Sequence, residues 1–410
     1  MLPSGNILGL PIKLLVTFAL LGIFLIWSLI GKKSIVFDTV MLGFVFVLVM
    51  LWCWGCIGSI NGYETVFACF KSFLSLLITV IATYLVIKNK IVSIEKSIKI
   101  IYLTAILIVL IKFMCEAVLV LGVMDWNQFR LAYSVITGTA VTTMQIPFGG
   151  IIIYRIMATN DFMPLVLLGF YLIFEKNSWI KKCVVVLLLG IYTFVVYSRV
   201  AMVQYAAIVF IYVASLIWDL IKCTTRERLA VFIVMMFLSV GLLSIVIVLK
   251  ADVIVSSFTT IIGSLYDRWF GTSATFSDSF RDEQSMYLWG GIKESPILGQ
   301  GLGSYIRGYL RSDELRFSYE AEYLSFLYQF GFVGFIIIIG GIIYLFAKIC
   351  FENTKGIRLK IILLVNFGIW ALRPIYNPQF LSSSSGMIIV VLFIAGSYYS
   401  KRLKMESKES

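Results

Sequence analysis

The sequence predicts an all-α protein that crosses a membrane many times. Three observations lead to this fold class: 60% of the 410 residues are hydrophobic, only 14% are charged, and long apolar runs recur along the whole chain. A run of about 18 or more apolar residues spans about 30 Å of hydrocarbon as a helix. These runs lack the period-two alternation of a transmembrane barrel, so helices are the expected spanning elements.

Eleven apolar runs are expected to be transmembrane helices. They lie at 12–31, 35–57, 66–87, 98–122, 157–175, 183–198, 200–218, 229–250, 321–347, 358–373 and 384–400. A further run at 131–153 is apolar, but it is rich in Thr and Gly and contains Pro147. We expect it either as a re-entrant or interfacial segment, which gives eleven spans, or as a twelfth span.

Lysine and arginine residues cluster in alternate loops, and the net charge is +12. The positive-inside rule places such loops on the cytoplasmic side, which leaves the loop at 251–320 outside. The charge therefore reports orientation in the membrane, and no nucleic-acid partner is expected.

The spans and the long loop divide the chain into three parts. We expect an N-terminal transmembrane bundle at 1–250, a large external loop at 251–320, and C-terminal transmembrane helices with a cytoplasmic tail at 321–410. A loop of about 70 residues is far longer than most connections, and its aromatic content indicates that it is folded. Residues 282–295 are expected as a short helix that ends before Pro296, and residues 304–312 as another.

The chain has no His, which excludes His general bases and His metal ligands. A carboxylate is then the best available base, and Glu320 and Glu322 stand where the long loop enters the next span. Acidic residues in a first helical turn also stabilise the helix dipole, an alternative that the sequence leaves open. Other external acids, such as Asp278, lie in stretches that look solvated. Cys53 and Cys56 are expected as ordinary helix residues.

Two arginines, Arg155 and Arg199, stand at external breaks between apolar segments. Each either extends to the membrane surface or turns into the bundle to bind an anion such as a lipid-linked phosphate. The run "SPILGQGLGSY" contains Gly299, Gly301 and Gly303, which form either a tight turn or a backbone cradle for an anion. No strand pattern precedes it, so a dinucleotide site is excluded.

Three stretches together resemble the bacterial O-antigen polymerase and ligase family: "YSRVAM", "SFRDEQSMYLWGGIKESPILGQGLGSY" and "YEAEYLSFLYQFGFVG". In that family a Ser-Arg dipeptide starts a span. A long periplasmic loop then carries an arginine, a tryptophan and the pattern P-x-x-G-x-G, and a His or acidic residue leads into the next span. The resemblance covers residues 190–340 well, and "YRIMATNDFMP" resembles an earlier external motif more loosely.

The resemblance implies a GT-C-like, metal-independent and inverting glycosyltransferase that needs no cofactor. It implies a location in the bacterial inner (cytoplasmic) membrane with the active site facing the periplasm. The expected substrate is an undecaprenyl-diphosphate-linked oligosaccharide, in contact with membrane lipid, and a chain-length regulator protein is a further expected partner.

Motif positions suggest roles for individual residues. Arg155, Arg199 and Arg281 correspond to diphosphate-binding arginines of the family. Glu320 falls where its ligases often have His, so it is the expected base, with Glu322 as the second choice. This departure favours an O-antigen polymerase; an O-antigen ligase and a lipid-linked oligosaccharide flippase or transporter remain alternatives. The expected substrate-binding loop consists of Gly299, Gly301, Gly303 and Tyr305.

Overall fold

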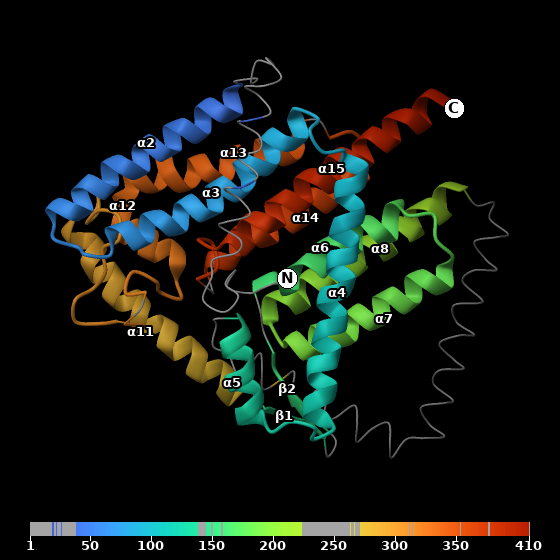
Figure 1. Cartoon of the computed structure of the whole chain (residues 1–410), viewed down its shortest axis with the longest axis horizontal. Coiled ribbons are helices and arrows are strands. Elements are labelled where there is room, and N and C mark those ends of the chain that lie inside the picture. Colours follow the sequence, from blue (N-terminus) through green and yellow to red (C-terminus); the bar gives the residue numbers. More distant parts are fainter. Residues whose placement is uncertain are drawn as a thin grey trace.

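A computed structural model shows a bundle of long helices with one small hairpin in the part of the chain that it describes (Figure 1). The described residues are 38–137, 145–148, 151–156, 159–223 and 271–409 without 311, 314, 353, 376 and 377, together with the single residues 19, 22, 26, 263 and 266.

The expected spans within these residues all contain helices. The helices are α2 (Thr39–Ile60), α3 (Val66–Lys88), α4 (Ile94–Val120), α6 (Phe162–Phe174), α7 (Trp179–Val196), α8 (Arg199–Cys223), α12 (Glu322–Gly334), α13 (Gly341–Phe351), α14 (Ile357–Leu372) and α15 (Ser383–Glu409). Among the described residues, seven helical stretches are long and apolar enough to cross a membrane. The polytopic all-α class is therefore confirmed. The expected spans 12–31 and 229–250 lie outside the described residues, apart from 19, 22 and 26.

The run at 131–153 is not a twelfth span. Helix α5 (Trp126–Thr137) is followed by the antiparallel strands β1 (Gln145–Phe148) and β2 (Ile151–Tyr154). β-Branched residues pair well across a hairpin, and a pair of short strands cannot satisfy its backbone as a membrane-spanning helix does. The one-turn 3-10 helix η1 (Thr159–Asp161) then leads into α6.

Helix α15 runs through the middle of the bundle (Figure 1). It packs against α3, α4, α6, α13 and α14, and Val391, Leu392, Ala395 and Tyr399 on it are fully buried. An apolar helix that neighbours cover on all sides belongs to the core rather than to the lipid boundary. The other helices are arranged around it.

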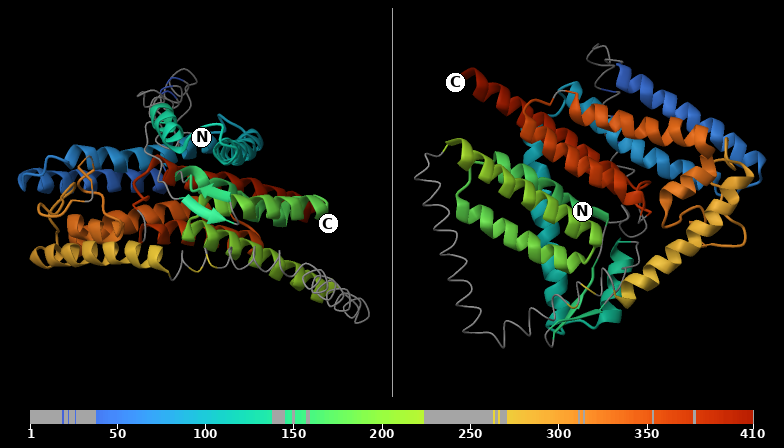
Figure 2. Two further views of the ribbon diagram at one scale, coloured as in Figure 1. Left: turned by 90° about the horizontal axis from the view of Figure 1, so that it is seen from below. Right: turned by 180° about the vertical axis from the view of Figure 1, so that it is seen from behind.

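Basic loops gather at one end of the bundle, as the alternation of charges in the sequence predicted. Lys401 at the end of α15 contacts Glu95 at the start of α4 at 2.6 Å, and Arg402 lies 3.6 Å from Glu175 after α6. Arg358 at the start of α14 pairs with Asp219 on α8. Figure 2 shows this end beside the C-terminus, with the loops around α12 at the opposite end.

That opposite end, here called the outer end, carries the described part of the long loop. Helix α11 (Thr272–Glu294) packs against α12 and runs at a steep angle to α2 and α13 (Figures 1 and 2). It stops before Pro296, as predicted, but it begins earlier than expected. The prediction of a helix at 304–312 is wrong, because the described residues there form a turn and irregular backbone.

Candidate active site

A short break between α7 and α8 fixes the position of Arg199. Helix α7 ends at Val196, and Tyr197 adopts a left-handed conformation with φ of 46°. The chain turns there, and Arg199 becomes the first residue of α8 at the outer end. Its Nη1 lies 3.2 Å from Oδ1 and 3.4 Å from Oδ2 of Asp278 on α11. A residue expected at a helix end therefore bridges two elements that are far apart in sequence.

Asp278 connects Arg199 to two further charged residues. Its Oδ1 also accepts a hydrogen bond of 2.7 Å from Nη1 of Arg281, three residues later on α11. Nε of Arg281 lies 3.0 Å from Oε2 of Glu320. We call this row the outer ion-pair chain: Arg199, Asp278, Arg281 and Glu320. It places two guanidinium groups and two carboxylates next to one another.

Helix α11 also holds the backbone of Glu320. The fully buried Gln284 lies one turn after Arg281, and its Oε1 accepts a 2.8 Å hydrogen bond from the amide of Glu320. The side chain and the backbone of Glu320 are therefore both tied to α11. This gives the carboxylate a defined position before α12 begins.

Arg155 lies at the same end, immediately after β2. Its neighbours on either side are clamped to α4: the amide of Tyr154 donates to Oε1 of Glu116 at 2.7 Å, and the carbonyl of Ile156 accepts from Lys112. Burial lowers the pKa of Arg155, and the nearby Tyr197 opposes this shift. Arg155 is therefore close to the α7–α8 break that positions Arg199, although it is not a member of the outer ion-pair chain.

Glu322 has different surroundings from Glu320. It is only 5% exposed, and its carboxylate accepts hydrogen bonds from the amides of Phe380 at 2.7 Å and Leu381 at 3.2 Å. These bonds fix the segment between α14 and α15. Glu320 lies before α12 and Glu322 is its first residue, and the non-helical backbone of Ala321 between them directs the two carboxylates to different parts of the protein.

The glycine-rich run wedges between α2 and α12. The amides of Gly299, Gly301 and Gly303 donate to the carbonyl of Ser295, the carbonyl of Gln329 and the side-chain oxygen of Gln329. All three glycines have positive φ. Because their amides already donate hydrogen bonds to oxygens of the protein, this conformation favours the tight turn over the anion cradle.

The run also forces close backbone contacts. A methyl group at Gly301 would overlap the backbone of Gly58 on α2, whereas a methyl group at Gly308 would meet no atom within 4 Å. We expect Gly301→Ala to destabilise the protein by about 2–4 kcal/mol through overpacking and left-handed strain. Gly308→Ala is the matched control in the same loop.

The measurement for this pair is the thermal unfolding midpoint of the purified protein in detergent. Gly301→Ala should unfold at a clearly lower temperature than Gly308→Ala. Equal midpoints for the two variants would contradict the close packing of Gly301 against the backbone of α2.

Tyr305 packs beside this run rather than beside the ion-pair chain. Its hydroxyl donates to Oε1 of Glu64 at 2.7 Å, and Arg316 contacts the same oxygen at 2.7 Å. The amide of Leu302 nearby donates to the carbonyl of Trp54. The four residues of the expected substrate-binding loop therefore lie against α2, the α2–α3 turn and α12.

Sequence reasoning missed two residues of this site. Asp278 was expected in a solvated stretch, yet it joins two arginines, and Gln284 was not singled out. Their spacing of three residues on either side of Arg281 is the signal that could have found them, because residues three apart lie on one helix face.

Comparison with protein families matches residues 184–339 to the family described as O-antigen ligase. No curated protein and no solved structure matches the chain significantly. The matched segment contains the whole outer ion-pair chain and most of α7, but it does not reach Arg155. The matched residues nearly coincide with residues 190–340, where the three stretches resemble the O-antigen polymerase and ligase family.

Proposed function

We propose that this protein polymerises O-antigen or a similar surface polysaccharide. The match of residues 184–339 to the family described as O-antigen ligase supports this class of reaction. The protein transfers a growing glycan from undecaprenyl diphosphate to a lipid-linked repeat unit. The observation that carries the proposal is the outer ion-pair chain, in which the guanidinium of Arg281 lies 3.0 Å from the carboxylate of Glu320. A group that can bind the leaving diphosphate, Arg281, therefore lies next to a group that can act as the base, Glu320.

The proposed reaction forms one bond and breaks one bond at the anomeric carbon. A hydroxyl of the acceptor sugar attacks from the face opposite the diphosphate, its proton passes to Glu320, and the bond to the diphosphate oxygen breaks. The configuration is inverted. Arg155, Arg199 and Arg281 stabilise the charge that develops on the departing diphosphate. Arginine suits this role because its planar fork binds phosphate oxygens in pairs.

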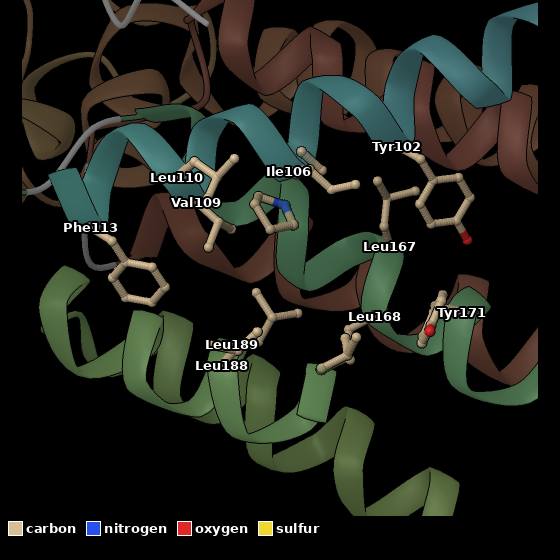
Figure 3. Close-up of a pocket in the computed structure, with 13 residues that line it drawn as sticks. Tyr102, Ile106, Val109, Leu110, Phe113, Leu167, Leu168, Tyr171, Leu188 and Leu189 are labelled. Atoms are coloured by element: carbon tan, nitrogen blue, oxygen red, sulfur yellow. The ribbon is translucent and has the colours of Figure 1, made fainter. Parts of the chain in front are cut away.

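An apolar groove beside the site supports a lipid-linked donor. It has a volume of about 360 Å³ and lies between α4, α6 and α7, as Figure 3 shows. Phe113 lies at one end and Tyr102 and Tyr171 at the other. The Phe113 end is next to Lys112, which binds the carbonyl of the residue after Arg155. A polyprenyl chain in this groove would have its diphosphate end near the arginines.

The groove gives a prediction with a matched pair of variants. Leu110 lines the groove, whereas Leu103 on the same helix does not, and both are more than half exposed. We expect Leu110→Trp to fill the groove and raise KM for an undecaprenyl-linked donor by about tenfold, since excluding a few buried methylene groups costs more than 1 kcal/mol. Leu103→Trp should leave KM unchanged.

A farnesyl-linked donor provides the control for chain length. Its shorter tail buries less surface in the groove, so its KM should change less in Leu110→Trp. Equal effects of the two tryptophan variants on the undecaprenyl donor would exclude the groove as the tail site.

A ligase that transfers the glycan to lipid A core is the second candidate, because the matched family is described by that activity. The chemistry is the same and the acceptor differs. Purified protein with lipid-linked repeats alone should form a ladder of longer chains if it is a polymerase. Product that forms only after addition of lipid A core would identify a ligase instead.

The proposed location is the inner membrane, with the outer end in the periplasm. Ser312 lies in the external loop and Lys404 lies near the end of α15 at the basic end. In a Cys-free background, Ser312→Cys should react with an impermeant maleimide on intact spheroplasts, and Lys404→Cys should react only after lysis. The reverse pattern would invert the orientation.

A further inference from the structure

The carboxylate of Asp278 lies where two arginines from different elements meet. Nη1 of Arg199 on α8 lies 3.2 Å away, and Nη1 of Arg281 on α11 lies 2.7 Å away. The side chain of Asp278 is 49% exposed, whereas those of Arg199 and Arg281 are 21% and 18% exposed. The most exposed member of the group is thus the anion.

This geometry resembles that of a bound phosphate. A carboxylate and a phosphate both accept charge-assisted hydrogen bonds from guanidinium groups, at similar distances. The Nη1 atoms that contact Asp278 are on the two arginines assigned above to the donor diphosphate. A diphosphate at these nitrogens would also lie against the negative charge of Asp278, and the two anions would repel each other.

We propose that Asp278 competes with the diphosphate for Arg199 and Arg281, an inference that rests on the proposed function. Its carboxylate pairs the two guanidinium groups and holds them together. When the donor binds, the diphosphate displaces the carboxylate, which turns fully to solvent and regains hydration in exchange for its ion pairs; it is already half exposed. Asp278 is therefore a positioning residue and does not take part in bond making.

The competition between Asp278 and the diphosphate matters most for product release, after the glycan has been transferred. The leaving undecaprenyl diphosphate carries one more negative charge than the diphosphate in the donor, so it binds the arginines more tightly. On release, the Nη1 atoms of Arg199 and Arg281 lose the diphosphate oxygens that they contacted. Asp278 takes the place of these oxygens at both atoms, which lowers the barrier to product release and keeps turnover from being limited by a tightly held product.

The test compares Asp278→Asn with Asp282→Asn. Both variants remove one negative charge from α11, but Asp282 is exposed and lies one turn further along the helix. Asparagine keeps the shape of aspartate and loses the charge. The probe is undecaprenyl diphosphate, and its dissociation constant and its inhibition constant as product are measured with the purified full-length protein.

We expect Asp278→Asn to bind undecaprenyl diphosphate about tenfold more tightly, the change expected from removing a charge-assisted competitor at a partly exposed site. kcat should fall while KM for the donor also falls. Asp278→Glu keeps the charge and should return the dissociation constant toward that of the wild type. Thermal unfolding midpoints show that each variant is folded.

Three outcomes would overturn the inference. Equal tightening in Asp278→Asn and Asp282→Asn would assign the effect to long-range charge. Weaker product binding in Asp278→Asn would mean that the carboxylate only arranges the arginines for binding. Failure of the wild type itself to bind undecaprenyl diphosphate would reject the proposed function, and the inference with it.

Discussion

Replacing Arg199 or Arg281 with alanine should abolish long glycan chains while the protein still inserts and accumulates. Each substitution removes a guanidinium group from the outer ion-pair chain, at 3.2 Å or 2.7 Å from the carboxylate of Asp278. Loss of one preorganised donor to a leaving group costs about 10²–10³-fold in kcat. The measurement is the rate of chain extension by purified protein with lipid-linked repeats. Arg155→Ala should behave similarly.

Two further variants sharpen this prediction. Arginine-to-lysine variants at these positions should recover only part of the activity, because lysine lacks the paired donors of a guanidinium group. Arg307→Ala is the control: Arg307 is exposed at the same end, where it contacts the carbonyl of Asn61 and the ring of Tyr63. If Arg199→Ala and Arg281→Ala extend chains as fast as Arg307→Ala, these side chains have no part in catalysis.

Glu320→Gln should nearly abolish chain extension and leave donor binding within a few-fold of the wild type. Glutamine is similar in size to glutamate and can still accept the hydrogen bonds of its neighbours, but it cannot take the proton of the attacking hydroxyl. A positioned base is worth about 10²–10⁴-fold in rate. The rate of extension and the dissociation constant of the donor are measured separately, so that a loss of chemistry is distinguished from a loss of binding.

Glu322→Gln provides the contrast. Its carboxylate holds the amides of Phe380 and Leu381 deep in the protein, so its replacement should lower the thermal unfolding midpoint. Glu320→Gln should not change that midpoint much. If Glu322→Gln is stable but inactive and Glu320→Gln is fully active, then Glu322 is the base and Glu320 is not. If both variants are active, departure of the arginine-bound diphosphate carries most of the catalysis without a carboxylate base.

Much of the architecture follows from local features of the sequence. The length of an apolar run predicts a spanning helix. Each of the nine spans expected within the described residues contains a helix, and seven of these helical stretches are long and apolar enough to cross a membrane. The alternation of basic loops predicts which loops share a side, and the ion pairs of Lys401 and Arg402 bring such loops together. These features are read from neighbouring residues, because the membrane imposes the same thickness and charge asymmetry on every span.

The sequence also indicated which charged residues stand at the outer end. Arg199, Arg281 and Glu320 were singled out from the absence of His, from breaks between apolar runs and from motif spacing. The structure brings the three together through Asp278 and α11. Which of the neighbouring glutamates faces the arginines could not be decided from the spacing alone, because it depends on where α12 begins.

Only the tertiary structure decided the features that depend on distant contacts. The glycine-rich run occupies a gap between α2 and α12, more than 200 residues apart in sequence, and that gap requires backbone without side chains. The hairpin at 145–154 forms because its strands pair with each other and α4 anchors Tyr154 through Glu116. Asp278 meets Arg199 across 79 residues of sequence. Composition and periodicity describe one segment at a time, whereas a shared carboxylate or a close backbone approach exists only once the segments are packed together.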